Sequence, residues 1–293
     1  MAGEIRCRFA CRPLTGATPG SISENQMTSR VLLVIAFALL ASASSANAQS
    51  DPRAEEHLRA ADDHYRNSRQ EEAIASYEQA AVEFQRLGNG AMAAHSFNQI
   101  GVILTRQDKY ESAKAYLGKA LAAGQASAGS DDLTLASTLL ALGVVHSAEG
   151  NFDQSLEAHR KALDIRLARL GKFDSNVATS YGNIGNVHFR KKDYDRAIEA
   201  HGIALQIRAR VFGEHGPEIV ESYRGLGNAY REKKDYPRAL EYFARALSNK
   251  IAQHGATHRD VGRLYLQISE VHSLAGNQTK AEEYRLKSEE SAT

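Results

Sequence analysis

The residues in this sequence that could carry acid–base or metal chemistry are its 11 histidines and several paired acids. Two of the histidines, His159 and His201, lie 42 residues apart, and Phe243 follows at the same interval. Three other histidines share a second recurring position with a tyrosine: His146, His188, Tyr230 and His272. A position that accepts either histidine or another ring is typical of packing, because catalysis or metal binding would require the imidazole. We therefore expect these histidines to be structural.

The sequence also lacks the short motifs that mark common active sites. It has no H-E-x-x-H zinc motif, no G-x-S-x-G nucleophile turn and no Walker-type phosphate loop. Adjacent acids, such as Glu71-Glu72 and Asp131-Asp132, fall at expected helix starts, where carboxylates are normally solvated. We predict no catalytic residue, no metal site and no cofactor.

Composition narrows both the fold and the class of partner. Only 5 prolines and no tryptophan occur in 293 residues, which favours long helices over an all-β fold. The chain has 36 basic and 35 acidic residues, and residues 1–48 hold four and two of them, which leaves 32 and 33. A net charge near −1 for the remainder gives no electrostatic case for binding nucleic acid.

The N-terminal region has the features of an export signal. An apolar run, VLLVIAFALL at residues 31–40, follows Arg30 and precedes the small-residue sequence Ala46-Asn47-Ala48. This order is typical of a signal peptide that is cleaved before Gln49. A membrane span needs roughly twenty apolar residues, about twice the length of this run. An uncleaved signal anchor is the alternative.

A start at Met27 gives the signal peptide ordinary proportions. We therefore interpret residues 1–26 as an over-called extension, 27–48 as the signal peptide and 51–293 as the folded part. Both cysteines, Cys7 and Cys11, precede the cleavage site, so the processed chain would contain no thiol. We expect an exported protein, periplasmic or extracellular, without a membrane span after processing.

A 42-residue repeat organises the rest of the chain. A hydrophobic residue followed by a small one recurs at this interval: Ile100-Gly101, Leu142-Gly143, Ile184-Gly185, Leu226-Gly227 and Ile268-Ser269. Aromatic and small residues follow each pair at fixed distances. The spacing predicts six units near residues 54–88, 89–126, 131–170, 173–212, 215–254 and 257–290. The outer two are degenerate, as expected of capping repeats.

Each unit is predicted to contain two helices. In the clearest unit, apolar residues of helical period predict a first helix over about residues 176–190 and a second that continues through Arg208. Asp193 lies between them and can cap the second helix. Pro217 suits the first turn of the following helix. Gly185 and Ala204 are small enough to let neighbouring helices approach closely.

The pattern [LI]-G-x-x-[HY], then D-[YF]-x-x-A, then A-L, resembles the tetratricopeptide repeat in the longer form of kinesin light chains and, secondarily, of Pins-type adaptors. The segment SYGNIGNVHFRKKDYDRAIEAHGIALQIR carries the resemblance best, and the likeness extends over about residues 54–290. The resemblance implies an all-α fold, a right-handed superhelical solenoid of about six helix-turn-helix repeats. It also implies a protein that binds other proteins rather than an enzyme.

In such a superhelix the first helix of each repeat lines the concave face. Asparagine is a poor helix former, yet it occurs at two equivalent positions in the middle of helices, Asn186 and Asn228. Helix propensity does not explain these two residues, so another role is expected. In the families that this sequence resembles, asparagine at matching positions holds the main chain of a bound peptide. The alternative is that these amides bond to a neighbouring helix. The predicted peptide-binding residues are Asn183, Asn186, Arg190, Arg224, Asn228 and Arg231.

The sequence leaves several functions open. The first is a non-enzymatic scaffold that binds a peptide or protein segment, and the arginines would favour an acidic one. The others are a structural protein that self-associates through its terminal repeats and a signal-anchored envelope assembly factor. The last helix is largely polar, which favours a terminated array and a monomer. In the predicted unit 131–170, the positions equivalent to the groove residues of the next unit carry Val144, Ser147 and Ala148 instead. The binding surface should therefore centre on residues 180–232.

Overall fold

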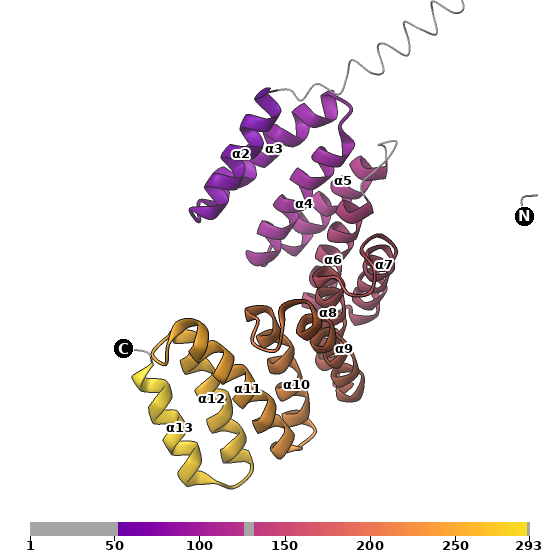
Figure 1. Ribbon diagram of the computed structural model, residues 1–293. Coiled ribbons are helices and arrows are strands. Elements are labelled where there is room, and N and C mark those ends of the chain that lie inside the picture. Colours follow the sequence, from indigo (N-terminus) through magenta and orange to yellow (C-terminus); the bar gives the residue numbers. More distant parts are fainter. Residues whose placement is uncertain (1–51, 126–131, 292–293) are drawn as a thin grey trace, which may run out of the picture. The chain divides into compact units, whose positions relative to one another are not determined.

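The part of the chain that the structure describes is built from helices. The computed structural model describes residues 52–125 and 132–291. These residues form twelve α-helices and a short 3-10 helix, and they contain no strand (Figure 1). The helices are α2 (Pro52–Arg66), α3 (Gln70–Arg86), α4 (Gly90–Arg106), α5 (Tyr110–Gln125), α6 (Asp132–Ala148), α7 (Phe152–Leu170), α8 (Ser175–Arg190), α9 (Tyr194–Phe212), η2 (Pro217–Ile219), α10 (Val220–Glu232), α11 (Tyr236–His254), α12 (Arg259–Leu274) and α13 (Gln278–Glu290).

Consecutive helices pack as pairs, from α2 with α3 to α12 with α13, and each pair packs against the next. The predicted all-helical fold of six helix-turn-helix units is therefore confirmed. The first helices of successive pairs also meet, since α6 contacts both α4 and α8, and α8 contacts α10. Side chains from these first helices can therefore share one surface.

The turn inside each pair recurs at the same register. Its residue of positive φ is Ser68, Asp108, Gly150, Lys192, Lys234 or Gly276, with φ between 57° and 83°. The next residue but one begins the second helix, and the residue between them caps that helix in the two turns where it is an aspartate. Asp193 accepts a hydrogen bond from the amide of Arg196 at 3.4 Å, and Asp235 accepts one from Arg238 at 3.2 Å. The cap predicted at Asp193 is confirmed.

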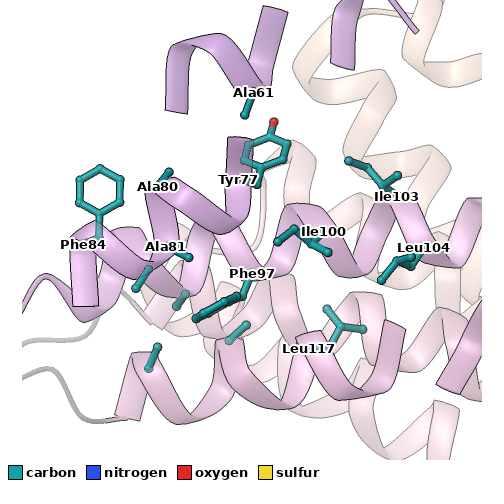
Figure 2. Packing of buried hydrophobic residues seen from close by; sticks show 14 of the residues in the cluster. Ala61, Tyr77, Ala80, Ala81, Phe84, Phe97, Ile100, Ile103, Leu104 and Leu117 are labelled. Atoms are coloured by element: carbon teal, nitrogen blue, oxygen red, sulfur yellow. The ribbon is translucent and has the colours of Figure 1, made fainter. Parts of the chain in front are cut away.

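Small residues and a few large side chains form the core. In the first pairs, Ala61, Tyr77, Ile100 and Leu117 belong to one buried cluster (Figure 2). The Tyr77 hydroxyl donates to Oδ1 of Asp62 at 2.6 Å, so its polar end is satisfied inside the repeat. Alanine dominates the buried positions, which lets the helices approach closely.

One packing contact repeats in four successive pairs. A Cβ added to the glycine of the first helix would lie within 3 Å of a side chain on the second helix: Gly101 against Leu117, Gly143 against His159, Gly185 against His201 and Gly227 against Phe243. His159 is 1% exposed and His201 is 3% exposed. The prediction that these two histidines occupy a packing position is therefore confirmed.

The predicted extension (residues 1–26), signal peptide (27–48) and cleavage site before Gln49 lie outside the described residues. Of the helices in the described ranges, none combines the length and the apolar character that crossing a bilayer requires.

Candidate peptide-binding pockets

Two helices from neighbouring pairs, α8 and α10, position most of the predicted binding residues. Asn183 and Asn186 lie three residues apart on α8, and Arg224 and Asn228 lie four apart on α10. Residues at these spacings share one face of a helix. Because α8 contacts α10, the two faces adjoin.

These four residues line one pocket of about 300 Å³, here called the α8–α10 pocket. Its lining is mostly polar and comes from α8, α9 and α10: Thr179, Gly182, Asn183, Asn186, His201, Arg208, Glu221, Arg224, Gly225 and Asn228. The structure thus brings together four of the six residues that the sequence singled out.

A second pocket, of about 240 Å³, adjoins the first. This α6–α8 pocket is lined by Val144, Ser147, Ala148, His159, Asn183, Asn186, Val187 and Arg190. Asn183 and Asn186 belong to both pockets, so they form the shared wall. The second pocket is the more apolar of the two because α6 contributes Val144 and Ala148.

Arg190 belongs to the α6–α8 pocket and is held there by the preceding repeat. Its Nη1 donates to the Oγ of Ser147 at 2.9 Å and to the carbonyl oxygen of the same residue. Its guanidinium also lies over the ring of Phe152, 5.3 Å from the centroid. These contacts fix the cation at the edge of the pocket.

Arg231, by contrast, lines neither pocket. Its Nη1 lies 2.6 Å from a carboxylate oxygen of Glu270 on α12, and its Nη2 lies 3.0 Å from Glu232. The side chain is 17% exposed. The structure gives Arg231 an ion-pairing role between repeats rather than a place in either pocket.

The three asparagine side chains differ in their partners. Asn228 accepts a long hydrogen bond, 3.5 Å, from Nε2 of Gln267 on α12, which is the kind of inter-helix contact that the alternative interpretation required. Within the described residues, the amides of Asn183 and Asn186 have no hydrogen bond, and Asn186 is exposed. The amide of Asn186 therefore has its donors and acceptor available.

Arg208, near the end of α9, is a pocket residue that the sequence reasoning missed. Its Nη1 donates to Oγ of Ser222 at 2.6 Å, and its guanidinium lies beside Gly182, about 4 Å from a Cβ added there. Burial lowers the pKa of Arg208, while Glu221 and Glu218 partly offset that effect. The signal for this residue was its recurrence, since Arg166, Arg208 and Lys250 are spaced by 42.

His201 forms the floor of the same pocket. Its ring also lies against Gly225 on α10, where an added Cβ would be 2.6 Å from the ring. Burial, with a smaller contribution from Arg208, lowers the pKa of His201 to about 4, so the ring is neutral at neutral pH. Its buried Nδ1 has no hydrogen-bond partner among the described residues.

The remaining charges in the region are largely paired. Arg224 lies 3.0 Å from Glu221, one helical turn away. Lys191 lies 2.5 Å from Asp153, and Lys233 pairs with Asp195, so these turn lysines contact the preceding repeat rather than the pockets. Within the described ranges, no group of three or more histidine, aspartate or glutamate side chains is placed to hold a metal ion.

The fold and the pockets define an all-helical solenoid of helix-turn-helix repeats. The tetratricopeptide repeat model matches residues 91–168 and 176–252. The chain therefore belongs to the tetratricopeptide repeat family. Proteins of this family bind proteins or peptides and are generally scaffolds rather than enzymes. A search of curated proteins found no match to the chain.

Solved structures share this fold at low sequence identity. BtubC (BKLC) from P. vanneervenii has a TM-score of 0.68 and 21% identity, over 76% of this chain and 91% of that one. Kinesin light chain TPR-like repeats from P. anserina have a TM-score of 0.58 and 14% identity, over 68% and 94%. The apo form of RapI has a TM-score of 0.57 and 16% identity, over 82% and 97%. The repeats are thus of the kinesin-light-chain type in fold.

Proposed function

We propose that this protein is a non-enzymatic scaffold that holds an extended peptide or protein segment across the two adjoining pockets. The observation that carries the proposal is the shared wall: Asn183 and Asn186 line both pockets, and their side-chain amides have no hydrogen bond within the described residues. An amide offers one donor group and one acceptor, which suits the main chain of a peptide. The partner is a protein segment rather than nucleic acid or a small metabolite.

The charges favour an acidic segment. Arg190 stands at the edge of one pocket, while Arg208 and Arg224 line the other, against a single acid, Glu221. The apolar side chain of Val144, which is exposed and lines the α6–α8 pocket, would accept a non-polar residue next to the acidic one. We further propose that the protein acts after export, as a soluble monomer.

The direct test is a selection from a phage-displayed library of random 12-residue peptides, with the chain from Gln49 onward immobilised. Peptides enriched on this chain, but not on the variant Asn186→Ala/Asn228→Ala, would support the proposal. Failure to enrich any peptide, or equal enrichment on the variant, would overturn it.

Self-association through the terminal repeats remains the second candidate. The last helix, α13, opposes it, because its charges pair within the helix rather than presenting an apolar face. Arg285 lies 2.6 Å from Glu282, and Lys287 lies 2.5 Å from Glu283. The exposed large apolar side chain on this helix is Leu286, and a single such residue does not make an apolar face.

A further inference from the structure

Three large apolar side chains are exposed at one end of the repeat formed by α8 and α9. Phe173, in the loop before α8, is 43% exposed, Val211 is 43% exposed, and Phe212, the last residue of α9, is 37% exposed. These three residues, here called the edge patch, line neither the α8–α10 nor the α6–α8 pocket. Apolar side chains that gather on a surface mark an interaction site, whereas single ones need no explanation.

The edge patch is peculiar to this repeat. At the three equivalent positions 42 residues later, the sequence has His215, Gln253 and His254, all of them polar. The contacts that hold the helices together do recur in the next repeat, as Gly185 against His201 and Gly227 against Phe243 show. Packing of the repeat therefore does not require apolar residues at the edge patch.

Phe173 and Val211 adjoin across two elements. The guanidinium of Arg210 lies 3.9 Å from the centroid of the Phe173 ring, so the end of α9 contacts the loop before α8. In the preceding repeat, Arg169 is equivalent to Val211, and its Nε donates at 2.7 Å to Asp132 at the start of α6. By the same geometry, Val211 points toward the start of α8, beside Phe173.

Two cations lie over the ring of Phe173. One is Arg210, and the other is Lys172, whose Nζ is 4.9 Å from the centroid. Neither has a carboxylate partner among the described residues. The carboxylate of Asp174 accepts a hydrogen bond from an amide of α8 at 2.7 Å, and Glu214, in the loop after α9, is an exposed acid that reduces the positive charge. The edge patch thus combines apolar side chains with two unpaired cations.

We infer that the edge patch makes a reversible contact with the surface of a phospholipid bilayer that contains anionic lipids. Proteins that lie at a membrane interface bury apolar side chains at the boundary of the acyl chains, while lysine and arginine meet the headgroups. A bilayer offers these two kinds of contact at adjacent depths. The inference goes beyond the proposed function, because the pockets that would hold a peptide contain no residue of the edge patch.

The test is co-sedimentation of the chain from Gln49 onward with two kinds of vesicle. One is phosphatidylcholine alone, and the other is equal parts of phosphatidylcholine and phosphatidylglycerol. The wild type should sediment with the anionic vesicles and more weakly with the neutral ones. Raising the salt concentration should reduce the difference between them, because salt screens the attraction of the cations to the lipid headgroups.

The variant Phe173→His/Val211→Gln/Phe212→His gives the edge patch the side chains that the next repeat has at these positions. It should keep the fold, which melting by circular dichroism checks, and should bind anionic vesicles at least about tenfold more weakly, because burial of the apolar side chains is lost. The matched control is Gln253→Ala/His254→Ala, at the equivalent edge of α11, and it should bind like the wild type.

A second variant, Lys172→Ala/Arg210→Ala, removes the charges and leaves the apolar side chains. Alanine is native at equivalent positions of later repeats, as Ala256 and Ala252. Each cation near an anionic surface accounts for about fivefold in binding, so this variant should bind anionic vesicles about tenfold or more weakly. Its binding to neutral vesicles should change little.

Three results would overturn the inference. The first is a wild type that sediments with neither kind of vesicle. The second is binding to anionic vesicles that neither variant weakens. The third is a display-selected peptide that the wild type binds and the three-residue variant does not, which would assign the edge patch to a protein partner. The variant Asn186→Ala/Asn228→Ala keeps the edge patch and should bind vesicles normally, so the proposed function is tested separately.

Discussion

The imidazole of His201 lies directly on Gly185 of the same repeat, so close that a Cβ on the glycine would sit 2.8 Å from Nε2. The ring is buried between α8 and α10, because Gly225 contacts its other edge. A single side chain therefore sets the spacing between two first helices, and both glycines are required for that spacing.

Replacing Gly185 with Leu should destabilise the protein by roughly 1–3 kcal/mol, because the added side chain must displace the His201 ring. Ala204→Leu should behave similarly, since Ala204 is fully buried on α9. The measurement is thermal and urea unfolding followed by circular dichroism.

The matched control is Gly202→Ala, also on α9, where no atom lies within 4 Å of an added Cβ. This change should be neutral or stabilising, by up to about 1 kcal/mol. Wild-type melting of Gly185→Leu would mean that the repeat register is misplaced.

Stability should fall as the pH decreases from about 6.5 toward 4. Burial lowers the pKa values of His159 and His201 from 6.5 to about 4, so in this range the unfolded chain binds more protons than the native one. Their stabilising effect is complete above pH 6.5 and is lost as the pH falls to 4. Each contributes a slope of roughly 1.4 kcal/mol per pH unit at most.

Urea unfolding at pH 7, 6 and 5 would measure that slope. The control is His159→Leu/His201→Leu, because Leu117 fills the same position in the second repeat. The double variant should show a clearly flatter dependence, and an unchanged slope would place the titrating groups elsewhere.

Replacing Asn186 and Asn228 with Ala should separate binding from stability. Alanine is the better helix former, and the only hydrogen bond lost within the described residues is the long one from Gln267, so melting should be unchanged or slightly higher. Affinity for a display-selected peptide should fall roughly 5- to 150-fold, which corresponds to about 1–3 kcal/mol. The exposed Gln206 on α9 lines neither pocket, and Gln206→Ala is the control. Lower stability with unchanged binding would make the asparagines structural.

N-terminal sequencing of the protein from its host should begin at Gln49. The basis is the apolar run at residues 31–40 followed by Ala46-Asn47-Ala48. Changing Ala46 and Ala48 to bulky residues should block processing and leave a longer chain. An intact chain in the membrane fraction of the wild type would instead establish a signal anchor.

The processed chain should be monomeric by size-exclusion chromatography with light scattering, with a mass below the 32.0 kDa of the full sequence. The internally paired charges of α13, including Arg285 and Lys287, are the physical reason. A concentration-dependent dimer or longer assembly would favour the self-associating alternative.

Periodicity made the fold predictable, because each packing contact is repeated at a constant interval. The 42-residue step placed Gly185 and His201 in packing positions, and local turn chemistry placed the cap at Asp193. The same step aligned Asn186 with Asn228, which do line one pocket.

Contacts between repeats were harder to predict because they depend on how one repeat is offset from the next. Arg231 and Glu270 are 39 residues apart and form an ion pair that no motif indicates. Arg208 appeared to be part of the buried stripe of its helix. Arg208 lines a pocket and donates to Ser222, whereas Arg166, 42 residues earlier, donates to Ser180 and also to the carbonyl oxygen of Asn176.

The matching turns make the chain divisible into interchangeable modules. Lys192 and Lys234 have the same φ of 62°, and each is followed by a capping aspartate. Joining Lys192 directly to Asp235 would excise 42 residues and still leave a turn of native geometry. Gly185 would then face Phe243, the same type of contact that Gly227 makes now. Deleting one such unit would thus give a shorter solenoid whose turns and packing contacts all occur in the present one. Adding one unit would extend the binding surface without a new fold.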